Sequence, residues 1–275
     1  MFNYFFGSDN RSIPYLEILY TNNKNLKVIT TPPVKQGRGN TFKANVVEKY
    51  CKENNISIDY FKSDAVYLDM EYGLCVSFRE IFTSTFINSN NPIYNIHLSL
   101  LPMYRGPSPV ETSILDNNKD IGYTIFKIND EIDTGEILIQ RKLDYIKEMY
   151  ASLYYELAYK DFENIVEDIN LENPNLTVQN SANVKHTKKF NKQIFDITND
   201  SVEVAKNKIR AFDTIGPAFV IHNEILFKVL SYSNESKGFN IELLDGVIYP
   251  ETIIPEGKRK MSAEDYIRGN NGNFS

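Results

Sequence analysis

Residues 2–9 read Phe2-Asn3-Tyr4-Phe5-Phe6-Gly7-Ser8-Asp9, an aromatic run that ends in a turn. The run predicts a short buried strand, because aromatic residues favour strands and the Gly-Ser-Asp sequence favours a turn. An apolar face from Ile13 to Tyr20 predicts a helix, and Leu26 to Thr30 predicts a second strand. Strand, turn, helix and strand in this order indicate a parallel sheet with crossover helices, which binds ligands at the carboxyl ends of its strands.

The same alternation continues through the first two thirds of the chain. Further strands are expected at 56–61, 74–78, 93–98, 122–128 and 136–142, and helices at 45–52, 108–115 and 150–169. Residues 171–182 have the polar composition of a linker. We therefore predict that residues 1–182 form an α/β domain with a Rossmann-like, mostly parallel sheet, and that residues 150–182 supply its last helix and the linker.

The remaining residues, 183–275, follow another pattern. One helix is expected at 202–212, and short apolar segments separated by turns follow at 218–222, 225–231, 239–244 and 247–253. Short strands with frequent turns are typical of small barrels. We predict that this part is a smaller, OB-like β-barrel domain.

Composition excludes several classes of protein. No apolar run approaches the roughly 20 residues that span a bilayer, so the chain is expected to be soluble. Cys51 and Cys75 are too few for a disulfide framework or a zinc site, which indicates a reducing compartment and no metal. A Gly-x-Gly-x-x-Gly sequence is absent, which argues against a nicotinamide cofactor. The net charge of −6 argues against a protein that coats nucleic acid along its whole surface.

Candidate catalytic groups gather in Asn95-Ile96-His97-Leu98-Ser99-Leu100-Leu101-Pro102-Met103-Tyr104-Arg105-Gly106, and again in Asp133-Thr134-Gly135. Asn95 and His97 are two apart on a predicted strand, so their side chains share one face. A histidine can accept a proton, a nearby carboxylate such as Asp133 can orient it, and an amide can stabilise a developing oxyanion. Neither a reactive Cys nor a Ser in a nucleophile elbow accompanies them, which favours direct transfer between two substrates. From the residues alone, an ordinary hydrogen-bonded pair stays the alternative.

Basic residues gather at three places. The loop of residues 32–42 and its flank carry Lys35, Arg38 and Lys43, with glycines on both sides of Arg38. The other two clusters lie in the C-terminal part, in Lys185, Lys188, Lys189 and Lys192, and in Lys258, Arg259 and Lys260. Solvated surface is one interpretation of such clusters, and contact with phosphate groups is the other.

These motifs resemble the formyltransferase family that uses 10-formyltetrahydrofolate. The residues that carry the resemblance are Asn95-Ile96-His97, Ser99-Leu100-Leu101-Pro102, Tyr104-Arg105-Gly106 and Asp133-Thr134-Gly135. Further segments resemble the members of the family that act on methionyl initiator tRNA: Phe5-Phe6-Gly7-Ser8-Asp9, Gly37-Arg38-Gly39, Gly122-Tyr123-Thr124-Ile125, Ile209-Arg210-Ala211-Phe212 and the stretch from Pro255 to Met261. The resemblance covers nearly the whole chain.

The resemblance implies a reaction and roles for residues. The formyl group of the co-substrate 10-formyltetrahydrofolate would pass to the amino group of methionyl initiator tRNA, for translation initiation. Asn95 would steady the oxyanion, His97 would act as base, and Asp133 would hold His97. Folate would contact Ser99, Leu100, Leu101, Pro102 and Phe78, and tRNA would contact Lys35, Arg38, Lys43, Lys188, Lys189, Lys258, Arg259 and Lys260. We expect a monomer without a metal, in the bacterial cytoplasm or alternatively the mitochondrial matrix.

Alternatives from the same family are kept open. A sugar-nucleotide N-formyltransferase shares the catalytic stretch, and so does the glycinamide ribonucleotide enzyme of purine synthesis, which has no comparable second domain. The segment Val76-Ser77-Phe78-Arg79 stands where the family commonly has an aromatic residue followed by Gly. This departure is the basis of a third alternative, a tRNA-binding remnant without catalysis.

The basic loop can be tested separately from the folate site. Arg38→Ala should weaken tRNA binding several-fold, because it removes one phosphate contact, and should leave folate binding unchanged. Filter binding of tRNA and fluorescence titration of folate measure the two effects, with Lys24→Ala as a control of equal charge change. Equal loss of both affinities would mean that the loop has a structural role.

Overall fold

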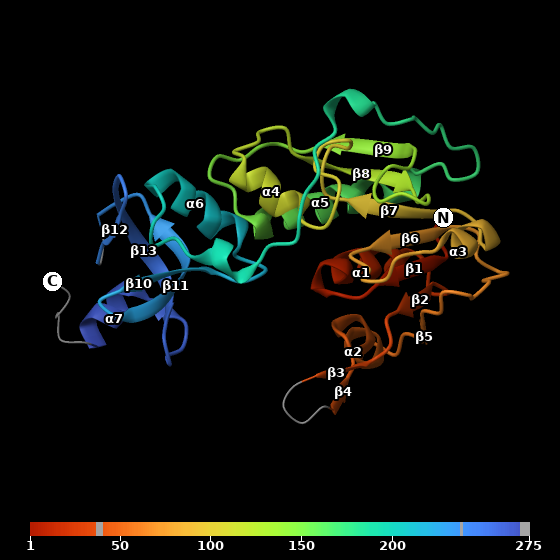
Figure 1. Ribbon diagram of the computed structural model, residues 1–275. Coiled ribbons are helices and arrows are strands. Elements are labelled where there is room, and N and C mark those ends of the chain that lie inside the picture. The colour runs from red at the N-terminus through yellow and green to blue at the C-terminus, as the bar shows by residue number, and fades with distance from the viewer. Residues whose placement is uncertain (37–40, 237–238, 270–275) are drawn as a thin grey trace. The chain divides into compact units, whose positions relative to one another are not determined.

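A seven-stranded sheet lies at the centre of the N-terminal part of the computed structural model, in the order β5-β2-β1-β6-β7-β8-β9 (Figure 1). Strands β5, β2, β1, β6 and β7 are parallel, whereas β8 and β9 are antiparallel to their neighbours. Their bounds are β1 Tyr4–Gly7, β2 Lys27–Thr30, β5 Ile58–Tyr60, β6 Gly73–Val76, β7 Ile93–His97, β8 Gly122–Lys127 and β9 Ile137–Lys142. The predicted α/β class with a parallel-rich sheet is confirmed.

The structure describes residues 1–36, 41–236 and 239–269. By its contacts the chain forms two units: residues 1–106, 122–143 and 155–186 make the first, and residues 107–121, 144–154 and 187–275 make the second. Both units therefore combine segments that are far apart in the sequence. The boundary after residue 182 stays a prediction.

The chain order reverses between β1 and β6. Strands β2 and β5 follow on one side of β1, and β6 and β7 follow on the other. Strands β1 and β6 are buried at every position, as expected for central parallel strands that are covered on both faces. Such a reversal opens a crevice between the loops at the carboxyl ends of the two strands, where α/β proteins bind ligands.

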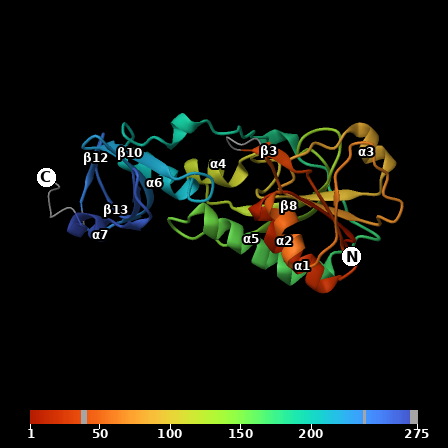
Figure 2. The ribbon, with the colours of Figure 1, turned by 90° about the horizontal axis from the view of Figure 1, so that it is seen from below.

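Helices cover the two faces of this sheet. Figure 2 shows α1, α2 and α5 on one side and α3 on the other. Helix α2 begins as predicted because the Asn45 side chain accepts a hydrogen bond from the Glu48 amide, at 2.9 Å. On the same side Tyr15 packs against Phe162, with ring centroids 5.3 Å apart. The bounds are α1 Ile13–Asn22, α2 Val46–Glu53, α3 Ser84–Ser89 and α5 Ala151–Ile165.

An aromatic cluster fills the other face of the sheet. Phe6 of β1 makes edge contacts with Phe78, Phe82 and Phe86, at centroid distances from 5.3 to 6.4 Å. Phe61 joins the same cluster, 5.3 Å from Phe78. Aromatic rings in this edge-to-face arrangement add to the stabilisation that burial of their apolar surface provides. The cluster therefore fixes the segment that follows β6.

The second unit contains an antiparallel sheet in the order β10-β11-β13-β12, with β14 also paired to β13 (Figure 1). Phe227, Ile209, Ile253 and Tyr266 are among the buried residues of its core. The elements are α4 Pro109–Leu115, α6 Val202–Ala211, β10 Ala218–His222, β11 Ile225–Ser233, β12 Ile241–Leu243, β13 Gly246–Pro255, β14 Met261–Ser262 and α7 Ala263–Gly269. The sheet is an antiparallel half-barrel, and its OB-like identity stays a prediction.

The structure differs from the sequence-based expectation in short elements. Residues 34–36 and 41–43, which were predicted as loop and flank, pair as the hairpin strands β3 Val34–Gln36 and β4 Thr41–Lys43. Helices α3 and α7 were not predicted. The expected linker is not free: Thr177 pairs with Ile137 through two backbone hydrogen bonds of 2.8 and 2.9 Å. Elements of three to seven residues carry too little periodicity to be recognised. Within the described ranges, no helix has the length and apolar character needed to cross a bilayer.

Gly122→Ala tests the packing of β8. A Cβ at residue 122 would lie 2.1 Å from the Arg141 carbonyl oxygen and 2.6 Å from Leu100 Cδ2. The paired strand would have to move, so we expect the free energy of unfolding to fall by about 1–3 kcal/mol in a urea titration. Gly269→Ala is the control, because a Cβ there meets nothing within 4 Å. Equal stability of the two variants would contradict this packing.

Candidate active site

Three predicted side chains meet on one face of the large sheet. Asn95 and His97 project from β7 on the face that carries the aromatic cluster, since Asn95 lies opposite Cys75 and Cys75 lies opposite Phe6. His97 is 5% exposed, and its Nδ1 lies 3.5 Å from Oδ2 of Asp133. The structure therefore brings the amide, the imidazole and the carboxylate to one place.

Asp133 reaches His97 by an indirect path. Strand β8 is antiparallel to β7 and ends with Lys127 opposite Tyr94, so the following loop leaves beside the amino end of β7. The loop must fold back over the sheet to bring Asp133 to His97, and Asp133 takes a left-handed backbone conformation with φ of 54°. A Cβ at Gly135 would lie 1.7 Å from the Lys127 carbonyl oxygen. Only glycine fits at that position.

Backbone groups of the loop after β7 complete the arrangement. The Gly106 amide donates a hydrogen bond to Oδ2 of Asp133, at 2.7 Å. Nε2 of His97 lies 2.8 Å from the carbonyl oxygen of Tyr104. Because a carbonyl oxygen only accepts, Nε2 carries the hydrogen, and in the neutral ring Nδ1 presents its lone pair beside Asp133. Sequence reasoning missed both backbone groups and assigned the orientation of His97 to Asp133 alone.

The groups around His97 suit proton transfer rather than covalent catalysis. The Asn95 side chain is half-buried and makes no hydrogen bond with any residue that the structure describes, so its amide is available to a substrate. Burial, and next the negative charge of Asp133, raise the pKa of the Cys75 thiol. Cys75 therefore stays protonated at neutral pH and is not a nucleophile.

The loop after β7 holds the predicted folate residues at different depths. Ser99 and Leu101 are buried, whereas Leu100 and Pro102 are half-buried. The Ser99 hydroxyl donates to the Met103 carbonyl oxygen at 2.5 Å. Ser99 thus shapes the loop, and Leu100 and Pro102 offer partly exposed apolar surface.

Phe78 stands after β6, the neighbour of β7. It is half-buried and stacks on Phe82, with centroids 5.6 Å apart. The Ser8 hydroxyl donates to the Ser77 carbonyl oxygen at 3.1 Å and accepts from the Arg79 amide at 3.0 Å. The turn after β1 therefore fixes the segment in which the chain departs from the family pattern.

The predicted tRNA-contacting residues are exposed wherever the structure describes them. Lys35 and Lys43 lie on the β3–β4 hairpin, and Arg38 lies outside the described residues. Beside Lys35, Phe42 is 69% exposed, with the Lys35 Nζ 5.4 Å from the ring centroid. The other predicted contacts, Lys188, Lys189, Lys258, Arg259 and Lys260, are among the exposed basic residues of the second unit.

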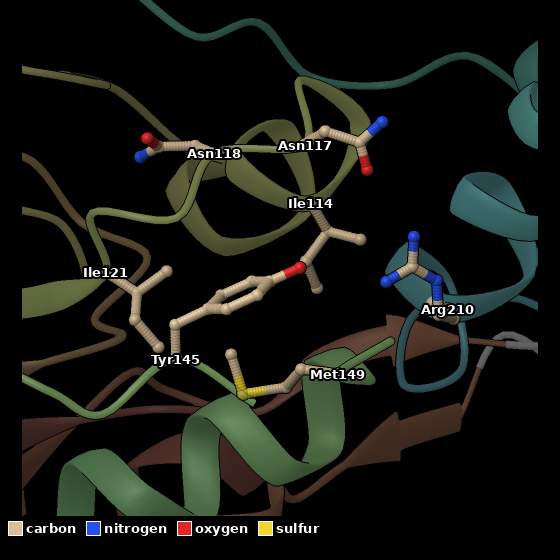
Figure 3. A pocket seen from close by; sticks show the side chains of 7 residues that line it. All are labelled: Ile114, Asn117, Asn118, Ile121, Tyr145, Met149 and Arg210. Atoms are coloured by element: carbon tan, nitrogen blue, oxygen red, sulfur yellow. The ribbon is translucent and has the colours of Figure 1, made fainter. Parts of the chain in front are cut away.

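Two hollows in the structure have none of Asn95, His97 and Asp133 in their linings. Figure 3 shows a cavity of about 10 Å³ in the second unit, toward which the Tyr145 hydroxyl and the Arg210 guanidinium point. That volume holds about one water molecule, which excludes a folate. A hollow of about 430 Å³ lies at the amino ends of β6 and β7, between Tyr72, Tyr94 and Leu171. In the described ranges, no group of three or more His, Cys, Asp or Glu side chains could hold a metal ion.

Comparison with known sequences identifies relatives over nearly the full length. Residues 8–166 match the family model described as Formyl transferase. A methionyl-tRNA formyltransferase of Thermosipho africanus is 32% identical over 96% of this chain and 95% of its own length. A methionyl-tRNA formyltransferase of Borrelia hermsii is 27% identical over 97% of this chain and 96% of its own.

Solved structures share the fold. The methionyl-tRNA formyltransferase of Clostridium thermocellum superposes with a TM-score of 0.61 at 18% identity, over 95% of this chain and all of that one. An N-formyltransferase of Helicobacter canadensis, solved with folinic acid and dTDP-3-aminofucose, superposes with a TM-score of 0.63 at 23% identity. The match covers 95% of this chain and 100% of that one. A variant of HypX from Aquifex aeolicus superposes with a TM-score of 0.66 at 13% identity. The match covers 100% of this chain and 48% of that larger protein.

Thr124→Val tests the support of the loop after β7. The buried Thr124 hydroxyl donates to the Ser99 carbonyl oxygen at 2.7 Å and accepts from the Leu101 amide at 3.1 Å and the Gln140 amide at 3.0 Å. Valine leaves these groups without their partner, so we expect a loss of about 2 kcal/mol or more in the free energy of unfolding. Thr124→Ser keeps the hydroxyl and should lose less. A serine variant that is less stable than the valine variant would refute this role.

Proposed function

Because this chain belongs to the formyl transferase family, we propose that it transfers the formyl group of 10-formyltetrahydrofolate to the amino group of methionyl initiator tRNA. That it is a formyl-transferring enzyme follows from the family match and from relatives that align with it over nearly their full length. The observation that carries the proposed chemistry is the approach of His97 Nδ1 to Asp133, at 3.5 Å, on the strand face that also presents Asn95. The bacterial relatives favour the bacterial cytoplasm as its compartment.

In this proposal Asn95 and His97 act on two different atoms. The amino group of the acceptor attacks the formyl carbon, and the Asn95 amide donates a hydrogen bond to the oxygen that becomes negative. His97 accepts the proton that the new nitrogen–carbon bond releases, at Nδ1, where its lone pair lies. His97 then delivers this proton to the folate nitrogen as the bond between that nitrogen and the formyl carbon breaks.

Asp133 and two backbone groups support the charged form of His97. When Nδ1 is protonated, the Asp133 carboxylate lies beside the positive ring at 3.5 Å. Nε2 keeps its hydrogen and donates it to the Tyr104 carbonyl oxygen throughout, so the ring keeps its orientation. The Gly106 amide donates to Oδ2 of Asp133 and so holds the carboxylate close to the ring. All these groups belong to the first unit of a single chain, which supports a monomer.

The surroundings of the three side chains suit a folate. A folate combines ring systems that pack on apolar side chains with polar edges that need hydrogen-bond partners, and apolar walls with a few polar groups bind such ligands. Leu100, Pro102 and Phe78 are half-buried on the loops that follow β7 and β6, and Asn95 keeps its amide available. The bound co-substrate supplies the formyl group and the leaving nitrogen.

Methionyl initiator tRNA is favoured as the acceptor over a sugar nucleotide. Three relatives that cover 96%, 98% and 97% of this chain are named methionyl-tRNA formyltransferases. The similarity to the sugar N-formyltransferases lies under 25% identity and concerns the fold. Exposed basic groups such as Lys258 and Arg259 also suit a polyanion better than a small sugar.

The proposed function is tested with purified protein, labelled 10-formyltetrahydrofolate and methionyl initiator tRNA. We expect label in the tRNA fraction, recovered as formylmethionine after hydrolysis of the ester. The same experiment with an amino-sugar nucleotide should give no labelled sugar. Label in the sugar alone would refute the proposed acceptor, and tRNA binding without transfer would support a non-catalytic remnant.

Asp133→Ala should separate binding from turnover. Without the carboxylate, the protonated His97 loses its neighbouring negative charge, so we expect kcat to fall about 100-fold or more while both substrates still bind. Asp130→Ala is the matched control, because Asp130 is an exposed carboxylate in the same loop. Wild-type turnover of Asp133→Ala would remove that residue from the active site.

A further inference from the structure

Gln179 lies at the junction of the two loops that build the site. It is 9% exposed, although it stands in the segment whose composition predicts a linker. Its amide nitrogen donates hydrogen bonds to the carbonyl oxygens of Asp133, at 3.0 Å, and Gly135, at 2.8 Å. Its amide oxygen accepts two hydrogen bonds from Arg105, at 3.1 Å from Nε and 2.7 Å from the terminal nitrogen. Both ends of one buried side chain are therefore fully engaged.

The contacts of Gln179 join two segments that both touch the catalytic groups. Arg105 precedes Gly106, whose amide donates to the Asp133 carboxylate. Arg105 also follows Tyr104, whose carbonyl oxygen bonds His97. On the other side, the Gln179 amide donates to the backbone carbonyl oxygen of Asp133 itself. Gln179 thus ties the loop that orients His97 to the loop that carries Asp133.

The Asp133 loop needs such a restraint. It folds back from the amino end of β7, and Asp133 has a φ of 54°, a conformation that non-glycine residues adopt at a cost. Such a conformation persists only when its surroundings hold it. Gln179 is itself held, because Thr177 pairs with Ile137 of β9 and the Lys185 carbonyl oxygen accepts from the Arg105 amide at 2.8 Å. The restraint is thereby anchored to the sheet.

We propose that Gln179 is a positioning residue of the formyl-transfer reaction, which sets the distance between Asp133 and His97 through its two hydrogen bonds to the Asp133 loop. It touches no reacting atom in this proposal. The inference rests on the proposed function for its activity measurements, but the geometry on which it depends does not involve the identity of the acceptor.

Two variants separate the two ends of the side chain. Gln179→Glu keeps the size and the oxygen that accepts from Arg105, but it cannot donate to the carbonyl oxygens of Asp133 and Gly135. Gln179→Met removes both kinds of bond. We expect both variants to lower kcat about 10- to 100-fold, because small displacements of catalytic groups have effects of this size, and to leave KM for the folate within about 2-fold. Gln193→Met is the control, since Gln193 is exposed in the second unit.

A double-mutant cycle distinguishes positioning from general stability. If Gln179 acts through Asp133, Gln179→Met should lower kcat by less than about 2-fold when Asp133 is already Asn. The same fold loss in both backgrounds would overturn the proposal, and so would a Gln179→Glu enzyme with wild-type kcat. The cycle is run with whichever acceptor the wild-type enzyme formylates, so failure with methionyl-tRNA would count against the proposed function and not against Gln179.

A second readout needs no turnover. The chain has only three histidines, so the ring ¹⁵N signals of His97 can be assigned with His186→Gln and His222→Gln variants. Gln179→Met should shift the His97 signals in the same direction as Asp133→Asn does. An unchanged His97 spectrum in a folded Gln179→Met protein would contradict the proposed role.

Discussion

The approach of Asp133 to His97, at 3.5 Å, is the contact on which the rest of the site depends. His97 is the last residue of β7, whereas the loop that carries Asp133 begins at the other end of that strand, beside Tyr94. The contact therefore requires a loop that folds back on the sheet. Three features serve this requirement: glycine at residue 135, the left-handed backbone of Asp133, and the hydrogen bond from the Gly106 amide to the Asp133 carboxylate.

The proton transfer that such a contact supports does not depend on which molecule carries the acceptor amine. In the proposed reaction His97 acts on an amine and Asn95 on a formyl oxygen, and any primary amine presents the same atoms to His97. Choice of acceptor must then come from groups away from these atoms. Exposed basic residues such as Lys189, Lys258 and Arg259 offer the means to select a polyanion. Catalysis and selection are thus assigned to different side chains in this account.

The sequence predicted those features that depend on local pattern. Alternation along residues 93–98 placed Asn95 and His97 on one face. Chemical reasoning made Asp133 a candidate partner of His97, and resemblance to a family implied the same role, although no spacing rule could supply their contact. The path of the chain through loops was not predictable, because it depends on backbone groups that every residue possesses. The Tyr104 carbonyl oxygen is one such group. Gln179 was hidden for another reason, since it stands in a polar segment that resembles a linker until its pairing with β9 is seen.

The most direct measurement of the central claim is a competition between acceptors. Wild-type protein would be given labelled 10-formyltetrahydrofolate with methionyl initiator tRNA and an amino-sugar nucleotide together, and the label in each product would be counted at early times. We expect the label to enter the tRNA, and we expect Asp133→Asn to slow this transfer about 100-fold or more. Label that accumulates in the sugar nucleotide, or transfer to tRNA at the wild-type rate without the Asp133 carboxylate, would contradict the proposed function and site.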